Sequence, residues 1–502
     1  MPQSKAGAQP VDVSFDPKTG APAGEVVHTS SADVTTIVRR AAAVARSVAD
    51  SRPHERGNWI HAVAQALLDN CPELAALADE ETALGIARLT GELTKAAESA
   101  RFYASVAAEG SYLDVSIETL LDGSLLSRWN IPVGPVAVFG ASNFPFAFGT
   151  FGHDVASAIG AGCPVVVKAH PAHPRLTQRL ASVVRAALRE VGAPVGTFDL
   201  VVGFEAGLQV VDAGEIQAIA FTGSEEGGMA LVERGLRRGV PVFAEMGTVN
   251  PVFVTKAALD QQSQIVDGFV KSFTLGQGQF CTKPGLLLAP AGHGFFDAVV
   301  ARLSVAAGGA LLTNRIARAY EEGIERIGRS VGRKPVIETR SDGGFVVVPA
   351  VFRVRLEELK PGSPLLAECF GPVALVVEYE NVGQALAALD RLKPSLAASV
   401  FVGPDPDPDG SSAIAQLLAQ VGRVAVNAWP TGVAAAWSQH HGGPWPATSR
   451  PDATSVGAAA LRRFVRPVAV QNADASHFSQ ALEPTNPWNI PRRIHGKFLP
   501  ST

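Results

Sequence analysis

Short runs of apolar residues alternate with amphipathic stretches through most of this chain. From residue 133 onward, four such runs are separated by Gly and Pro and by stretches with helical spacing. A run that is apolar at every position is typical of a strand buried on both faces, and its alternation with helices is typical of a parallel, doubly wound sheet. We expect strands at Pro135–Gly140, Cys163–Lys168, Phe198–Gly203 and Ala218–Gly223, and helices at 174–191, 204–214 and 225–238.

The pattern on either side of this block predicts the rest of the fold. Residues 33–110 carry Ala, Leu and Val at three- and four-residue intervals among charged residues, which indicates successive amphipathic helices. A second alternating block runs from about 242 to 447 and predicts a second α/β domain, with expected strands at 285–289, 345–348 and 374–377. We expect 404–410 to be an exposed turn and the tail after about 470, rich in Pro, Asn and Arg, to wrap another surface.

Composition narrows the function classes. The chain has 502 residues, 47% of them hydrophobic, and 43 Lys+Arg against 47 Asp+Glu. Such a chain forms a large core, and its near-balanced charge offers no footprint for nucleic acid. Met1–Ala6 lacks an apolar signal segment, and no run of apolar residues is long enough to cross a bilayer. The four cysteines are far apart without a CxxC pair, so we expect reduced thiols in a cytoplasmic protein without membrane or nucleic-acid partners.

Two residues stand out as candidates for nucleophilic chemistry. Asn143 lies in an apolar segment that contains one acidic residue and neither Lys nor Arg between Arg128 and Lys168. Taken alone, it is either a turn residue that satisfies nearby backbone or an amide donor for a developing oxyanion. Cys281 lies in a Gly-rich polar loop, Gly276–Gly285, where access and a nearby base would make the thiol a nucleophile.

A carboxylate and a histidine pair are the other reactive groups. Glu245 ends the apolar run Pro241–Ala244, and either it is salt-bridged there or burial raises its pKa toward the range of a general base. The pair His440–His441 has no third ligand at metal spacing, so we expect no metal site.

The sequence lacks a GxGxxG cofactor fingerprint. In Phe221–Gly228 an apolar run leads through a Gly/Ser turn into a helix whose first residues could face a phosphate. Lys168 ends another apolar run, at the sheet edge where ligands bind in doubly wound folds. Each feature also has an ordinary structural explanation, as a common strand-to-helix turn or a solvated lysine.

Taken together and in order, these motifs resemble the NAD(P)-dependent aldehyde dehydrogenase superfamily over nearly the whole chain. The resemblance implies Cys281 as nucleophile, Glu245 as general base and Asn143 as oxyanion donor. It also implies a Rossmann-like cofactor domain, a catalytic α/β domain and a small β element that joins subunits into a homodimer or homotetramer. The implied cofactor-binding residues are Lys168, Gly223, Ser224, Gly228, Glu368 and Phe370, and the implied substrate-binding residues are Phe144, Phe148, Phe151, Phe280, Thr282 and Trp429.

On this resemblance we divide the chain into three parts. Residues 1–116 and 132–244 would form the cofactor-binding domain, 245–447 the catalytic domain, and 117–131 with 448–502 the oligomerisation element and tail. Within the superfamily, stretches such as 139–148, 167–174 and 427–433 look like the 2,5-dioxopentanoate (α-ketoglutarate semialdehyde) dehydrogenases. That branch implies oxidation of the semialdehyde to 2-oxoglutarate.

Two positions depart from the pattern of the superfamily. NAD-preferring members carry a carboxylate three residues after the ribose lysine, but here that residue is Pro171, so we expect NADP as the cofactor and leave NAD open as a second one. Many semialdehyde dehydrogenases place an Arg where this chain has Phe151. The cation for a substrate carboxylate would then be elsewhere, with Lys283, Arg450 and the pair His440–His441 as candidates.

Three alternatives stay open at this point. The chain could oxidise another aliphatic or semialdehyde substrate, act as a cofactor-independent thiol hydrolase through Cys281 and Glu245, or be a catalytically silent protein on the same fold.

Overall fold

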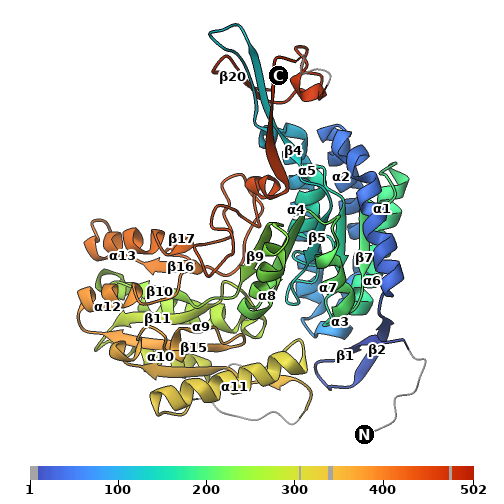
Figure 1. Ribbon diagram of the computed structural model, residues 1–502. Helices are drawn as coiled ribbons and strands as arrows, with labels where there is room; N and C mark the ends of the chain where they lie inside the picture. Colours follow the sequence, from blue (N-terminus) through green and yellow to red (C-terminus); the bar gives the residue numbers. More distant parts are fainter. Residues whose placement is uncertain (1–8, 305–306, 337–342, 474–477, 502) are drawn as a thin grey trace.

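A five-stranded parallel sheet forms the centre of the first lobe of the protein, with strand order β7-β6-β5-β8-β9 (Figure 1). The computed structural model describes residues 9–304, 307–336, 343–473 and 478–501. Met1–Ala6, where we noted the lack of a signal segment, lies outside the described residues. The strands are β5 (Val136–Phe139), β6 (Val165–Lys168), β7 (Phe198–Val201), β8 (Ala218–Gly223) and β9 (Val242–Met246).

Helices cover both faces of this sheet. Val136 and Val138 of β5 belong to one core, which α2, α4, α5 and α6 complete, whereas Ala137 belongs to the core under α1, α7 and α8. Burial on both faces explains why these strands are apolar at every position. The helices are α1 (Ser31–Asp50), α2 (Pro53–Asp69), α3 (Cys71–Thr82), α4 (Ile86–Glu109), α5 (His153–Ala161), α6 (Pro174–Glu190), α7 (Phe204–Asp212) and α8 (Glu225–Leu236). The predicted strands and helices of this lobe are confirmed, with ends that differ by a few residues.

A six-stranded parallel sheet forms the second lobe, in the order β14-β15-β11-β10-β16-β17. Its two faces are also buried, with Phe253 of β10 in one core and Val252 and Val254 in the other. Its strands and helices are β10 (Asn250–Val254), β11 (Pro284–Pro290), β14 (Ala350–Val354), β15 (Val373–Tyr379), β16 (Ser395–Phe401), β17 (Val421–Val426), α9 (Gln262–Thr274), α10 (Phe295–Leu303), α11 (Asn314–Val331), α12 (Val382–Leu389) and α13 (Pro408–Leu418).

Two predictions for this lobe are wrong in detail. The strand expected at 345–348 is only β13 (Val346–Val347), which pairs with β12 (Gly309–Ala310) outside the large sheet. The turn expected at 404–410 ends earlier, because Asp407 caps α13 by accepting a hydrogen bond from the backbone N–H of Gly410. Proline at the first helical position then suits the start of a helix.

A third, smaller sheet projects from the two lobes (Figure 1), with strand order β18-β4-β3-β19-β20. Strand β18 pairs antiparallel with β4, and the tail supplies β19, which pairs with β3, so part of the tail is regular structure that its composition did not predict. The strands are β3 (Val115–Thr119), β4 (Leu125–Pro132), β18 (Val465–Gln471), β19 (Arg492–Ile494) and β20 (Lys497–Leu499); a separate hairpin, β1 (Val11–Phe15) and β2 (Pro22–Val27), packs on the first lobe.

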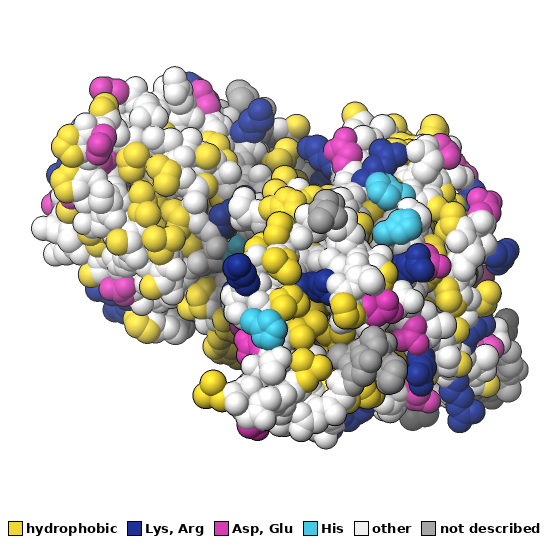
Figure 2. Space-filling model, turned by 90° about the horizontal axis from the view of Figure 1, so that it is seen from above, with side chains coloured by type: hydrophobic (Ala, Val, Ile, Leu, Met, Phe, Trp, Pro, Cys, Tyr) yellow, Lys and Arg dark blue, Asp and Glu magenta, His cyan; other side chains and the backbone are white. Residues whose placement is uncertain are grey.

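The chain passes from the first lobe to the second directly after β9, an edge strand of its sheet. Residues 447–449 return along this edge, where Thr448 forms an isolated antiparallel bridge with Glu245. Seen from above, a hollow separates the two lobes, with Lys and Arg side chains along it (Figure 2). Glu245 therefore lies at the junction of the lobes. Within the part of the chain that the structure describes, no helix is both long enough and apolar enough to cross a bilayer.

Candidate active site

Glu245 is almost fully buried at the end of β9 and has two side-chain partners. His441 Nε2 lies 2.9 Å from Glu245 Oε1, and Ser455 Oγ donates to Oε2 at 2.5 Å. The loop that carries both partners is fixed by its backbone, because the N–H of Ser455 donates to the carbonyl of His441 at 2.9 Å. A buried carboxylate with an imidazole and a hydroxyl partner is stable in its ionised form.

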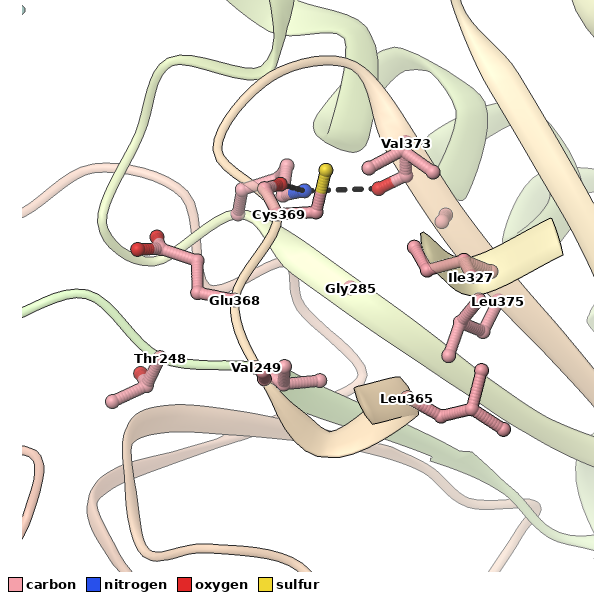
Figure 3. Close-up of a pocket in the computed structure, with 12 residues that line it drawn as sticks. Thr248, Val249, Gly285, Ile327, Leu365, Glu368, Cys369, Val373 and Leu375 are labelled. Carbon is pink, nitrogen blue, oxygen red and sulfur yellow. Dashed lines mark hydrogen bonds between the residues drawn. The ribbon is translucent and has the colours of Figure 1, made fainter. Parts of the chain in front are cut away.

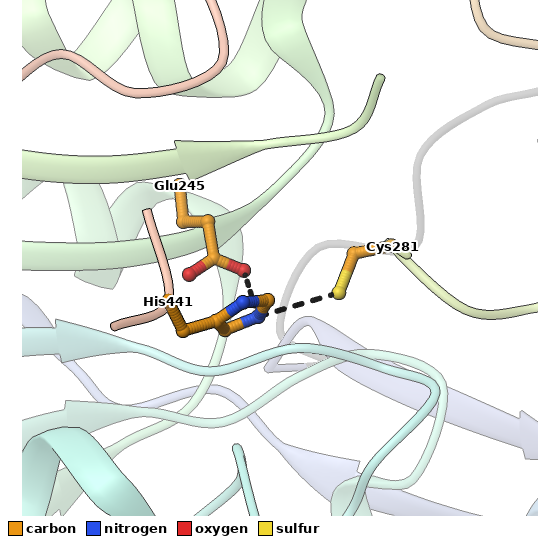
Figure 4. A group of neighbouring side chains, drawn as sticks. All are labelled: Glu245, Cys281 and His441. Carbon is orange, nitrogen blue, oxygen red and sulfur yellow. Dashed lines mark hydrogen bonds and ion pairs between the residues drawn. The ribbon is translucent and has the colours of Figure 1, made fainter. Parts of the chain in front are cut away.

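Cys281 approaches the same imidazole from the second lobe (Figure 4). Its Sγ lies 3.6 Å from His441 Nε2, and Sγ, Nε2 and a Glu245 oxygen all lie within 4.8 Å of one another. Cys281 follows the short helical turn Leu275–Gly278 and precedes β11, and Gly276 in that turn has a φ of +54°, which favours glycine. The structure therefore assembles a Cys–His–Glu group from residues far apart in the sequence.

The charges in this group shift one another's ionisation. Burial opposes the charged form of Glu245, but the nearby His441 and the Ser455 hydroxyl outweigh it, and the pKa of Glu245 is lowered. Burial also opposes the imidazolium, yet Glu245 and Cys281 raise the pKa of His441. Of the two alternatives left open for Glu245, the structure favours the ion pair, with His441 as a partner that sequence alone did not reveal.

The thiol of Cys281 is under opposing influences. Burial raises its pKa, the hydrogen bond to His441 lowers it, and the charge of Glu245 raises it again. Because one nitrogen, His441 Nε2, faces both anions, its proton can stabilise the thiolate or the carboxylate most closely but not both equally. The imidazolium is therefore a cation shared between a nucleophile and a base.

Asn143 lies in the loop after β5 and reaches the loop of Cys281. Its Nδ2 donates to the backbone carbonyl of Gln279 at 2.8 Å, two residues before the thiol. An amide nitrogen carries two N–H groups, so one remains for an oxygen that develops charge next to Cys281. Asn143 is thus held against the loop that carries Cys281, whose thiol lies near His441 and Glu245.

Lys283 holds a second loop against this one. Figure 3 shows Glu368 and Cys369 of this second loop and Val373 at the start of the strand that follows it. The buried Nζ of Lys283 donates to the backbone carbonyls of Cys369, Gly371 and Val373 at 2.9–3.0 Å, which uses all three ammonium hydrogens. Lys283 therefore fixes the loop of Glu368. It is not free to bind a substrate carboxylate, although its position in the sequence made it a candidate for that role. Arg450, another candidate, is paired with Asp452 at 2.8 Å.

Aromatic side chains surround the reactive group. The rings of Phe144 and Phe280 are 5.0 Å apart, Phe144 and Phe148 are 5.8 Å apart, and Phe148 lies 6.0 Å from the His441 ring. The structure does not bring the other two predicted aromatic residues into this cluster. Phe151 is buried in the core of the first lobe, and Trp429 packs on Phe269 and Phe401. Thr282, next to the nucleophile, is buried.

These features match known proteins along the whole chain. Residues 5–445 match the model of the aldehyde dehydrogenase family. The chain is 37% identical to alpha-ketoglutaric semialdehyde dehydrogenase 2 of Azospirillum brasilense, covering 99% of this chain and 98% of that protein, and 35% identical to an alpha-ketoglutaric semialdehyde dehydrogenase of Acinetobacter baylyi, covering 88% and 87%.

The chain belongs to the aldehyde dehydrogenase family. It oxidises aldehydes with NAD(P)⁺ as the hydride acceptor, which confirms the predicted class of enzyme. Its fold is similar to that of an NAD-dependent aldehyde dehydrogenase from Sinorhizobium meliloti, with a TM-score of 0.80 and 22% identity over 92% of this chain and 91% of that one. The predicted α/β class is also confirmed.

The residues expected to bind the dinucleotide in this aldehyde dehydrogenase lie along the junction of the lobes. Lys168 ends β6 and is half-buried, and Ser224 caps α8 by accepting from the N–H of Gly227. The backbone N–H groups at that helix start suit a phosphate. A Cβ on Gly223, the last residue of β8, would lie 2.6 Å from the Phe221 ring, and one on Gly228, inside α8, would lie 2.8 Å from Met246 Sδ, so a side chain at either position would displace its neighbour.

Glu368 lies in the second lobe, in the loop that precedes β15. A Cβ on Gly247 would lie 1.9 Å from Glu368 Oε2, so the carboxylate reaches the backbone just after Glu245 only because that residue is glycine. Burial raises the pKa of Glu368 to about 7, and Phe370 is half-buried in the same loop. A carboxylate accepts well from ribose hydroxyls, so these residues fit the nicotinamide ribose.

Sequence reasoning missed the central role of His441. It considered His441 only as half of the pair His440–His441, as a metal ligand or a substrate clamp, because a separation of 160 positions hides its contact with Cys281. The Cys281, His441 and Glu245 side chains also form a set that could hold a metal ion, which sequence spacing did not indicate. The signal available was a histidine in a Gly-rich loop, Gly442–Gly443 following it directly.

Proposed function

We propose that this aldehyde dehydrogenase oxidises α-ketoglutarate semialdehyde (2,5-dioxopentanoate) to 2-oxoglutarate. The proposal rests on the identity of 37% with alpha-ketoglutaric semialdehyde dehydrogenase 2 of Azospirillum brasilense, which extends over 99% of this chain. A similarity over full length includes the loops that shape the substrate site as well as the core. The alternative is another aliphatic aldehyde or semialdehyde.

In the mechanism that we propose, the thiolate of Cys281 adds to the aldehyde carbon and forms a C–S bond. The carbonyl oxygen becomes an oxyanion, which the Asn143 amide and the backbone N–H of Cys281 stabilise. The bound nicotinamide supplies the acceptor for the hydride that leaves this carbon. The product of that step is a thioester on Cys281.

Hydrolysis of the thioester uses the carboxylate. Glu245 accepts a proton from the attacking water, the new C–O bond forms, and the C–S bond breaks with its electron pair on sulfur. The imidazolium of His441, 3.6 Å from Sγ, stabilises the thiolate that leaves. His441 therefore serves both halves of the reaction, while Glu245 acts as base only in the second.

We propose NADP as the preferred dinucleotide. The support is the half-buried Lys168 together with Pro171, which stands where a carboxylate would repel a 2′-phosphate. Burial lowers the pKa of Lys168, and a phosphate beside the ammonium group would favour its charged form. NAD is accepted as well if the lysine binds the ribose hydroxyls instead.

We also propose the domain limits given above, a homodimer or homotetramer, and a cytoplasmic location. The support for association is β18, which is an edge strand of the third sheet and has several exposed residues. The unpaired backbone groups of an edge strand can pair with a strand of another subunit. All four cysteines are free thiols, which a reducing compartment maintains.

Initial rates of reduced-cofactor formation test the proposal. The substrates are 2,5-dioxopentanoate, succinate semialdehyde and hexanal, each with NADP and with NAD. The proposal predicts the highest kcat/KM for 2,5-dioxopentanoate with NADP. A higher kcat/KM for hexanal would refute the substrate, and a higher value with NAD would refute the cofactor preference.

A further inference from the structure

One arginine on α4 lies beside the catalytic loops although the mechanism does not use it. Arg88 is the third residue of α4, and its Nη2 donates to the backbone carbonyl of Asn143 at 2.9 Å. The side-chain amide of Asn143 is the proposed oxyanion donor. The guanidinium is therefore in direct contact with the residue that stabilises the reacting carbonyl.

Two aromatic rings flank the guanidinium. Arg88 Cζ lies 5.5 Å from the centre of the Phe144 ring and 5.1 Å from that of Phe280. Phe144 follows Asn143 in the chain, and Phe280 precedes Cys281, so both rings belong to the wall around the nucleophile. Cation–π contacts of this kind hold an arginine in place without using its N–H groups.

The guanidinium has hydrogen-bonding capacity to spare. Among the described residues, Arg88 Nη1 is buried and has no hydrogen-bond partner. Glu92, one turn further along α4, acts on Arg88 through its charge. Its Oε1 accepts from the backbone N–H groups of Phe146 and Ala147, and its buried Oε2 has no hydrogen-bond partner among the described residues. A guanidinium has five N–H groups, so a second, bidentate acceptor can still bind.

A glycine leaves the room for this nitrogen beside the catalytic loop. A Cβ on Gly276 would lie 2.3 Å from Arg88 Nη1. Gly276 is in the turn that leads to Cys281, so the free end of the guanidinium points at the loop of the nucleophile. An unpaired buried cation is costly, and burial accordingly lowers the pKa of Arg88.

Two other cations considered for the substrate, one lysine and one arginine, are engaged. Lys283 donates to three backbone carbonyls, and Arg450 is paired with Asp452. Arg423 of β17 donates to the carbonyls of Pro430 and Gly432, although its Nε is without a partner among the described residues. Within the described part of the chain, Arg88 is the arginine that combines a free N–H end with contacts to Asn143 and Phe280.

We propose that Arg88 binds the carboxylate of the substrate and so selects an aldehyde that carries an acid at its far end. The proposal rests on the proposed function, because it deepens the assignment of 2,5-dioxopentanoate. In that molecule four carbon–carbon bonds separate the aldehyde carbon from the carboxylate carbon. The aldehyde meets Cys281, and the carboxylate replaces the missing partner of Nη1.

The test compares kcat/KM for 2,5-dioxopentanoate and for pentanal, a neutral aldehyde of the same chain length. The variants are Arg88→Met, Arg88→Lys and Arg423→Met, with Arg101→Met as the matched control on the same helix, where the guanidinium donates to Gln65. Inhibition by glutarate, competing with the aldehyde, gives a second readout of carboxylate binding.

We expect Arg88→Met to lower kcat/KM for 2,5-dioxopentanoate about 10- to 100-fold, mainly through KM, and to weaken glutarate by a similar factor. The value for pentanal should change less than about 3-fold. Arg88→Lys keeps the positive charge without the planar guanidinium, so its kcat/KM for 2,5-dioxopentanoate should fall less than that of Arg88→Met. If Arg88→Met does not fold, the lysine variant and the glutarate constant carry the same comparison.

Three results would overturn the proposal. Equal losses for both aldehydes would mean that Arg88 only positions Asn143, while the substrate assignment stands. A selective loss in Arg423→Met instead of the Arg88 variants would assign the carboxylate to the other arginine. A wild-type enzyme that prefers pentanal would refute the substrate and, with it, the role of Arg88.

Discussion

Replacing His441 with glutamine removes the cation between Cys281 and Glu245 while keeping an amide of similar reach. At an effective dielectric constant of about 20, charges 3.6 Å apart interact by about 4–5 kcal/mol, so the imidazolium stabilises the thiolate by that order. Glu245, within 4.8 Å of the sulfur, opposes it by at least about 3 kcal/mol. The His441→Gln variant keeps the repulsion and loses the attraction.

The predicted effect on reactivity follows from these energies. A loss of about 4–5 kcal/mol lowers the thiolate fraction at neutral pH about 1,000-fold. The more basic thiolate of the variant is also more nucleophilic, and on a logarithmic scale this restores about half of the lost reaction rate. We therefore expect Cys281 to react with dithiodipyridine about 30- to 100-fold more slowly in His441→Gln at pH 7. The difference should disappear at high pH, where both thiols are ionised and the raised pKa of His441 is exceeded.

The double variant His441→Gln/Glu245→Gln tests whether the charge of Glu245 destabilises the thiolate. Because the carboxylate is gone, Cys281 of the double variant should react with dithiodipyridine at least about 10-fold faster than in His441→Gln. Cys281→Ala corrects for the other thiols, and His440→Gln is the matched control because its ring lies outside the reactive set. A wild-type rate in His441→Gln, or a double variant slower than the single one, would refute the reasoning.

Three further predictions concern the same region. Cys281→Ala should abolish turnover and leave dinucleotide affinity within about 3-fold, as measured by fluorescence titration; steady-state oxidation in this variant would contradict its role. Glu245→Gln should give a stopped-flow burst of reduced cofactor followed by slow turnover, whereas loss of the burst would place Glu245 in thiol activation. Lys283→Met leaves three buried carbonyls without their donor, and each costs about 1–3 kcal/mol of folding free energy. The variant should therefore have a Tm lower by about 5–10 °C and weaker dinucleotide binding, with Lys256→Met, at an exposed position, as control. An unchanged Tm would contradict the structural role of Lys283.

The strands of the first lobe were predictable because both of their faces are buried. Two strands of the second lobe, β16 and β17, contain Ser, Gly or Arg, and some of these polar side chains have partners outside the strand. Ser399, for example, donates to the carbonyl of Ala428 at 2.8 Å. No local pattern indicates such a partner, so these strands did not stand out in the sequence.

The candidate site was also predictable only in part. Cys281, Glu245 and Asn143 were recognisable from their motifs, whereas the contact between Cys281 and His441 joins residues 160 positions apart. Lys283 follows Cys281 closely in sequence, yet its side chain turns to the loop of Glu368. Arg88 stands on an amphipathic helix, where a cation normally indicates a solvated face, and only the packing of α4 on the Asn143 loop places it at the site.

The covalent intermediate is the most direct test of the account. Glu245→Gln would be mixed with 2,5-dioxopentanoate and NADP, quenched in acid within the burst, digested and examined by mass spectrometry. The account predicts the mass of the 2-oxoglutaryl group on the peptide that contains Cys281, in an amount equal to the reduced cofactor formed, and none when the oxidised cofactor is omitted. Reduced cofactor without an acyl group on Cys281 would contradict it.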